Sequence, residues 1–235
     1  MSLVCLVSFD VMSDYQTPFC AREQQTAKTS LQKIEAEWPM RGSGDRVSQY
    51  VQKIGIRLAH FSPYGQNIRW QFLIVRNLAP NAFSIGDGYV FITDGAVNFV
   101  QNESELAAIL AHELGHQLAG HFCESSDLSN SGGLFDIFSD PNAQQHQVGV
   151  GSMTQVINPV KEQQADQIAL SILQAGGYNP RAMLDLARRL PSGTQGDLMD
   201  ISRIQSLEYT LANFPAILVG NSEDFQTIKR ILANE

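Results

Sequence analysis

The sequence lacks the features of a nucleic-acid-binding or a membrane-spanning protein. Its 235 residues include 16 Lys and Arg against 24 Asp and Glu, which gives a net charge of −8, and no cluster of Lys or Arg is visible. This charge balance argues against a nucleic-acid surface. No apolar stretch approaches the length of about 18 residues that a transmembrane helix needs. Internal repeats are also absent, and a hydrophobic content of 43% is enough for one sizeable core.

Cysteine and targeting signals are sparse. The three cysteines, Cys5, Cys20 and Cys123, are an odd number, so at least one is unpaired in a monomer. For Cys123 we expect a packing role. The N-terminal stretch Leu3–Phe9 is apolar but short, and no basic region precedes it as in a secretory signal. The stretch fits either a shortened signal or a buried strand. Residues 1–20 are predicted to be a leader or a flexible N-terminus, and residues 21–235 a single domain.

The most informative motif is His112-Glu113-Leu114-Gly115-His116. The run before it has apolar residues at helical spacing, and Asn102 with Glu105 three residues later is typical of a capped helix start. Because residues four apart share one helix face, both imidazoles can bind one metal ion, and zinc is the expected metal. Glu113 is placed to take a proton from a water molecule at that ion. The alternative is a surface helix with solvated histidines, which the apolar setting disfavours.

Two schemes could supply a third metal ligand. In the first, a histidine follows six residues after the second, but that position is Phe122; His121 would lie on the far side of a continued helix and is expected to be a polar helix-end residue. In the second, a glutamate comes from another helix. Pro159 is suited to open one, with Glu162 and Asp166 on one face. Glu162 can bind the metal, and Asp166 can accept the other ring N–H of a ligand histidine. A solvated helix face is the alternative.

These segments resemble peptidase family M48, a family of zinc metallopeptidases, over about residues 46–191. The resemblance is carried by an edge-strand segment (81–93), an active-site helix (103–116), an E-x-x-A-D helix (162–166) and the turn after it (176–180). It implies that His112, His116 and Glu162 bind one zinc ion per chain. It also implies that Glu113 is the general base and that Asp166 orients a ligand histidine.

One departure from the family concerns a later His-Pro pair. The corresponding stretch here is residues 211–215, in which Phe214 stands in place of the histidine. A phenyl ring cannot bind zinc or donate a hydrogen bond to an oxyanion, and losing one such donor typically costs on the order of 10²–10³ in rate. Arg203 and Tyr209 are alternative donors. The sequence thus supports a zinc-dependent endopeptidase, with a zinc-stabilised binding or chaperone-like module of little hydrolytic activity as the alternative.

The expected fold is α+β, a mainly helical zincin-like domain with a small sheet of about three strands beside the active-site helix. Strands are predicted at Ile68–Val75, Asn81–Ile85 and Tyr89–Thr93. Further helices are predicted at 27–37, 45–60, 181–190, 201–211 and 223–232. Asn81, Ala82 and Phe83 are the candidate substrate-binding edge, because an exposed edge strand can pair with an extended peptide. A capped structural edge is the alternative.

The expected partner is an unfolded or extended polypeptide. Residues 124–158 are rich in Ser, Gly, Asn, Asp and Gln and are predicted to border the cleft, either as a lid or as a disordered insertion. Their apolar island, residues 134–138, is a candidate for peripheral membrane contact. Related bacterial peptidases are often exported or lipid-anchored, so a periplasmic or envelope location is expected. The sequence carries no signal for the oligomeric state.

Overall fold

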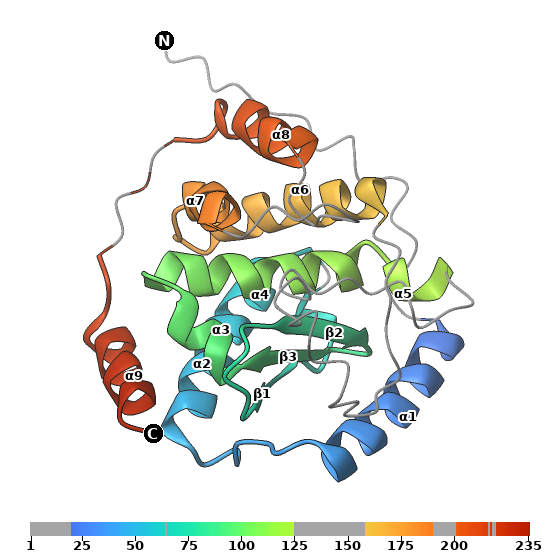
Figure 1. Cartoon of the computed structure of the whole chain (residues 1–235). Coiled ribbons are helices and arrows are strands. Elements are labelled where there is room, and N and C mark those ends of the chain that lie inside the picture. The colour runs from blue at the N-terminus through green and yellow to red at the C-terminus, as the bar shows by residue number, and fades with distance from the viewer. Residues whose placement is uncertain (1–19, 64, 125–157, 190–200, 216, 218–219) are drawn as a thin grey trace.

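The computed structural model describes residues 20–63, 65–124, 158–189, 201–215, 217 and 220–235. These residues form a mainly helical α+β fold with a small sheet, as predicted. The elements are α1 (Ala21–Glu37), α2 (Arg46–His60), η2 (Gly65–Asn67), β1 (Gln71–Val75), β2 (Ala82–Gly86), β3 (Tyr89–Thr93), α3 (Asp94–Phe99), α4 (Glu103–Leu118), α5 (His121–Glu124), α6 (Pro159–Ala175), α7 (Arg181–Arg189), α8 (Ile201–Leu211) and α9 (Glu223–Ala233). In Figure 1, α4 runs between the sheet on one side and α6 on the other.

The sheet is mixed and has the order β1-β3-β2. β1 pairs with β3 in parallel and β2 pairs with β3 in antiparallel orientation, so β2 is an edge strand. One face of the sheet, with Phe72 and Ile92, belongs to the principal core that α2, α4 and α6 share. The other face, with Ile85 and Phe91, packs against Ile34 of α1. The sheet is therefore covered on both faces and presents β2 at its edge beside α4.

Capping residues explain why several helix boundaries were predictable. Asp45 precedes α2 and its carboxylate accepts hydrogen bonds from the main-chain N–H groups of Val47 and Ser48. Asn102 caps α4 by accepting from the N–H of Glu105, as the sequence predicts. The first strand begins at Gln71 rather than at the predicted Ile68, and α3 and α5 were not predicted. Both are short helices, for which periodicity gives little signal.

The helices α4 and α6 approach each other closely at Gly115. A Cβ atom at this position would lie 2.5 Å from the carbonyl oxygen of Ala165 and 3.0 Å from its Cα. Real Cβ contacts are not that short, so only glycine allows this approach of the two backbones. Pro159 opens α6 as predicted, with Asn158 as its cap. The packing brings the histidine motif of α4 against the Glu162–Asp166 segment of α6.

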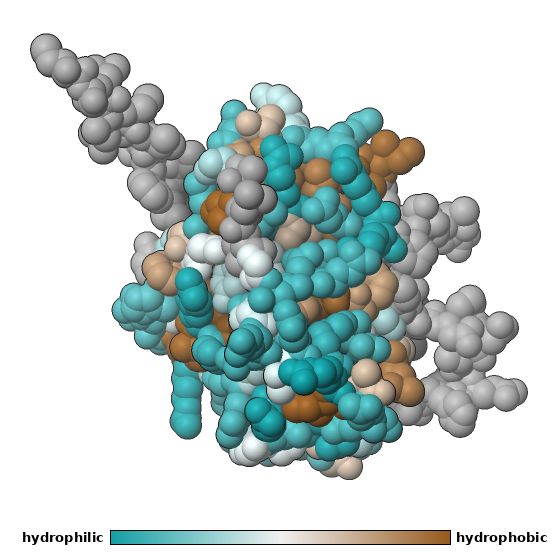
Figure 2. All heavy atoms as spheres, turned by 90° about the vertical axis from the view of Figure 1, so that its left-hand side faces the viewer, coloured by the Kyte–Doolittle hydropathy of each residue, from teal (hydrophilic) through white to brown (hydrophobic). Residues whose placement is uncertain are grey.

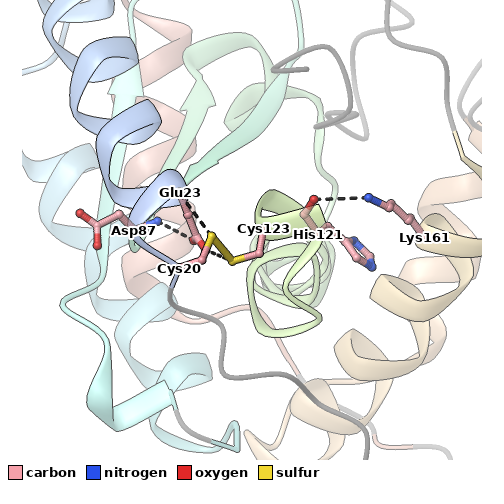
Figure 3. The surroundings of a disulfide bond; sticks show 6 residues. All are labelled: Cys20, Glu23, Asp87, His121, Cys123 and Lys161. Carbon is pink, nitrogen blue, oxygen red and sulfur yellow. Dashed lines mark hydrogen bonds between the residues drawn. A yellow bond between two sulfur atoms is a disulfide. The ribbon is translucent and has the colours of Figure 1, made fainter. Parts of the chain in front are cut away.

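A disulfide joins Cys20, which caps the start of α1, to Cys123 in α5 (Figure 3). The packing role predicted for Cys123 is therefore wrong, because this cysteine carries a covalent link to a residue 103 positions away. Glu23 lies beside the sulfur atoms and is buried; its carboxylate accepts a hydrogen bond from the N–H of Asp87. Burial raises the pKa of Glu23 to about 7. The link attaches α1 to the segment that follows the histidine motif.

Removing this disulfide is expected to destabilise the protein substantially. The bond closes a loop of about 100 residues, for which the loss of unfolded-state entropy corresponds to roughly 2–5 kcal/mol. The variant Cys20→Ser/Cys123→Ser should therefore unfold at a lower urea concentration than the oxidised wild-type protein. Cys5→Ser is the matched control, since Cys5 takes no part in this bond. Equal unfolding midpoints for the double variant and the wild type would contradict the expectation.

One face of the molecule carries small, separate hydrophobic groups (Figure 2). The face in Figure 2 is mostly hydrophilic, and its hydrophobic side chains are scattered. None of the helices in the described part of the chain is both long and apolar enough to span a bilayer. The insertion predicted to border the cleft, residues 124–158, lies almost entirely outside the described residues. Its apolar island at 134–138 lies wholly outside them. The predicted membrane contact therefore stays a prediction.

Candidate active site and metal centre

Three buried side chains from two helices converge at the α4–α6 contact. His112 and His116 come from α4 and Glu162 comes from α6, and all three can direct a ligand atom to one point. The two Nε2 atoms are 3.0 Å apart. Nε2 of His112 lies 3.3 Å from Oε2 of Glu162, and Nε2 of His116 lies 3.4 Å from Oε1. Tetrahedral ligands of a zinc ion are about 3.3 Å apart, so this nitrogen and oxygen set fits zinc.

Asp166 and Arg203 hold two of these side chains in place. Asp166 lies one turn after Glu162 on α6, and its Oδ1 is 3.0 Å from Nδ1 of His112. With a metal on Nε2 of His112, this contact would hold the ring proton on Nδ1, which is the orienting role that the sequence predicts for Asp166. Arg203, from α8, donates to both oxygens of Asp166 at 2.7 Å and to Oε2 of Glu162 at 2.9 Å. Arg203 therefore compensates the charge of two buried carboxylates.

The electrostatics of the site follow from this arrangement. Burial would raise the pKa values of Glu162 and Asp166, but the cations beside them, Arg203 foremost for Asp166, hold both pKa values below their usual range. Burial would also lower the pKa of His112, but hydrogen bonds to Asp166 and Glu162 raise it to about 9. Both carboxylates are thus anionic at neutral pH. A divalent cation would replace a proton in a site that already attracts positive charge.

Glu113 lies next to the metal-ligand set but does not belong to it. Its side chain is 1% exposed, and its Oε2 accepts a hydrogen bond of 2.9 Å from Oγ of Ser84 on β2. Burial raises the pKa of this carboxyl group. A raised pKa brings a carboxylate closer to the range of an effective general base at neutral pH. The hydrogen bond also connects the candidate base to the edge strand of the sheet.

Comparison with known proteins identifies the family. The family model described as "Peptidase family M48" matches residues 45–227, which is most of the chain. The chain belongs to peptidase family M48. The match includes every residue of the converging site, from His112 to Arg203. A family of metallopeptidases agrees with a metal-binding arrangement built from two histidines and a glutamate.

Two relatives illustrate how far the similarity to named M48 peptidases extends. The beta-barrel assembly-enhancing protease of Escherichia coli (strain K12) is 26% identical over 215 residues, which cover 78% of this chain and 42% of that protein. The mitochondrial metalloendopeptidase OMA1 of Schizosaccharomyces pombe is 30% identical over 109 residues, which cover 43% of this chain and 31% of that protein. This chain thus spans less than half the length of either relative.

The structure brings the three predicted ligands together. It also places Arg203 and His121 differently from what was expected from the sequence. Arg203, considered as an oxyanion donor, binds Glu162 and Asp166 instead. His121, expected at the end of a continued helix, follows a break: α4 ends at Leu118, and Gly120 adopts a φ of 70°. His121 is only 4% exposed. The residue is absent from the ligand cluster, in agreement with the prediction, but it is neither solvated nor on the α4 helix.

The structure also shows where the residues at the replaced family histidine and at the predicted substrate edge lie. Phe214, the residue predicted to replace the family histidine, is partly buried and packs against the principal core. Tyr209, the other candidate donor, is 80% exposed. The predicted substrate edge coincides with β2, but the ring of Phe83 stacks on Phe91 in the core under α1, and Ala82 is fully buried. Any contact of this strand with a peptide would therefore use its main chain.

Proposed function

We propose that the protein is a zinc-dependent metalloendopeptidase that hydrolyses peptide bonds in unfolded or extended polypeptides. The observation that carries the proposal is the convergence of the His112 and His116 Nε2 atoms with the Glu162 carboxylate, next to a buried Glu113 that is not part of the ligand set. A purely structural zinc site is usually closed by four protein ligands. Three ligands with a carboxylate beside them leave a position for water and substrate, which is typical of a hydrolytic site.

The side chains divide the chemistry between them. A bound zinc ion supplies Lewis acidity, which lowers the pKa of water and polarises a peptide carbonyl. Glu113 accepts the proton of the attacking water and delivers it to the leaving amine. Ser84 orients the Glu113 carboxylate through the 2.9 Å hydrogen bond. Asp166 and Arg203 keep His112 and Glu162 in their binding orientations.

The outer edge of β2, which pairs with no further strand of the described sheet, is the candidate site for an extended substrate. The main-chain groups of Asn81 face β3, since its carbonyl accepts from the N–H of Thr93. Hydrogen-bonded and non-hydrogen-bonded positions alternate in an antiparallel pair, so the main-chain groups of Ala82 and Ser84 face away from β3. Both residues are buried in the structure, at 0% and 1% exposure, so a peptide that pairs with them would first have to displace the atoms that cover this edge; it would then lie beside Glu113, to which Ser84 is bonded. Main-chain pairing of this kind is largely independent of the peptide sequence.

We also propose that the protein acts in protein quality control in the cell envelope. The disulfide between Cys20 and Cys123 favours an oxidising compartment such as the periplasm. One of the relatives is named a beta-barrel assembly-enhancing protease, which places that protein's role in the assembly of barrel proteins. An edge strand that pairs with its substrate through main-chain hydrogen bonds would accept an unfolded polypeptide.

The proposal is tested by measuring metal content and casein hydrolysis on the same preparation. We expect about one zinc ion per chain and hydrolysis of unfolded casein, which a chelator stops and added zinc restores. A tightly folded protein serves as the matched substrate control and should be cleaved much more slowly. Hydrolysis that persists after complete removal of metal would refute the proposal. Stoichiometric zinc without hydrolysis would instead support the binding or chaperone-like module.

A further inference from the structure

His121 lies at the centre of a hydrogen-bonded chain behind one of the candidate zinc ligands. Its Nδ1 is 2.9 Å from Nδ1 of His116, and its Nε2 is 3.0 Å from Oε1 of Gln164 on α6. The main-chain carbonyl of His121 accepts a hydrogen bond from Nζ of Lys161. In Figure 3 the His121 ring points away from the disulfide and toward the α6 side of the molecule. Buried on α5, the ring therefore bridges α4 and α6.

The positions of the protons in this chain follow from the requirements of a metal ligand. His116 can offer Nε2 to a metal only if its ring proton is on Nδ1. That proton must point at Nδ1 of His121, which is then an acceptor and carries no proton. A neutral imidazole has one donor and one acceptor, so the proton of His121 is on Nε2. There it meets Oε1 of Gln164, a group that only accepts.

We propose that His121 is a positioning residue that fixes the tautomer and the ring orientation of His116 for zinc binding. This inference rests on the proposed function, because it assumes that His116 is a zinc ligand. His112 and His116 are then oriented in the same manner by different groups: the anion Asp166 accepts from the first, and the neutral ring of His121 accepts from the second. Residues that orient metal ligands typically contribute a factor of 10–100 to metal affinity.

The neutral partner suits the charge of the site. The cluster already contains the anions Glu162 and Asp166, which share the cation Arg203. A third carboxylate behind His116 would add another buried negative charge, which is costly unless a cation compensates it. An imidazole supplies the acceptor without that charge. The position of α5 is in turn fixed from both sides, by Lys161 on α6 and by the Cys20–Cys123 disulfide.

The test is the zinc dissociation constant, measured by competition with a chromogenic chelator. His121→Phe removes the acceptor but keeps a ring, and it should weaken zinc binding by roughly 10–100-fold. His121→Asn offers an amide oxygen near the place of Nδ1 and should recover most of the affinity. Recovery by asparagine is a result that simple packing does not explain. His60→Phe, at an exposed helix-end histidine of α2, is the matched control and should bind zinc like the wild type.

The outcomes separate this inference from the proposed function. Wild-type protein that fails to bind zinc would refute the proposed site, and with it the role of His121. Wild-type binding together with unchanged affinity in His121→Phe would refute only the inference. If His121→Phe does not fold, Gln164→Leu gives the same test, because it removes the acceptor for Nε2 of His121. Nitrogen NMR of the zinc-loaded wild type should show His116 protonated on Nδ1 and His121 on Nε2; the opposite tautomers would overturn the inference.

Discussion

Replacement of Glu113 by glutamine is expected to leave zinc binding intact and to reduce the hydrolysis of casein by about 10²–10⁴-fold. Glutamine has the shape of glutamate and can still accept the hydrogen bond from Ser84, so the fold and the neighbouring ligands should be unaffected. An amide cannot take a proton from water at neutral pH, however. The loss should therefore appear in kcat, with little change in metal content. Both quantities can be measured on the same purified sample.

The matched control for this variant is Glu103→Gln. Glu103 lies on α4, the same helix, but at its first turn and away from the metal-ligand cluster. This substitution removes the same charge and should leave casein hydrolysis at the wild-type rate. If Glu113→Gln retained wild-type turnover, the assignment of Glu113 as the general base would be wrong. If both variants lost activity together with zinc, the effect would lie in folding rather than in proton transfer.

The parts of the site that were predictable from the sequence are those encoded locally. His112 and His116 are one helical turn apart, and Glu162 and Asp166 are related in the same way, so the spacing alone places each pair on one helix face. The cap Asn102 sets the start of α4, and Pro159 is the first residue of α6. That α4 and α6 lie side by side was predicted from the resemblance to family M48 and not from a local pattern.

The features that were missed depend on contacts between distant parts of the chain. Cys20 and Cys123 are 103 residues apart, and no local pattern pairs them. Arg203 on α8 donates to Asp166, which lies 37 residues earlier in the chain. The prediction for His121 assumed a continuous helix, whereas Gly120 takes a positive φ and turns the chain. A glycine before a histidine at the end of a helical run was the one local signal for this break, since glycine is common where helices end.

The site as a whole depends on how closely two helices approach. Three of its groups belong to α4 and two to α6, so the ligands and the candidate base all lie on the two helices that make the contact. Rigid elements hold functional groups more accurately than loops do. The distance between the helices is in turn set by the residue in the middle of their contact, which is part of the histidine motif itself. Gly115 is therefore the point at which packing and metal binding are coupled.

Substitution of Gly115 by alanine is expected to lower both the stability of the protein and its affinity for zinc. The new Cβ would be 2.5 Å from the carbonyl oxygen of Ala165, and backbone on the facing helix cannot rotate away as a side chain can. The helices must separate, which typically costs about 1–3 kcal/mol of stability. Because Ala165 lies between Glu162 and Asp166 in α6, the same shift displaces the carboxylates from the histidines. We expect zinc affinity to fall at least about 10-fold.

The sign of the change in stability in Gly115→Ala distinguishes a packing effect from an effect of helix propensity. In an unconstrained helix, alanine is more favourable than glycine by about 1 kcal/mol, so propensity alone predicts a more stable variant. Gly44→Ala, in the turn before α2, is the control for the steric effect, because no atom lies within 4 Å of a Cβ at that position. Urea denaturation of the metal-free proteins and chelator competition give the two readouts. A Gly115→Ala protein as stable as the wild type, with unchanged zinc affinity, would mean that the helix contact tolerates a wider spacing and does not set the geometry of the metal site.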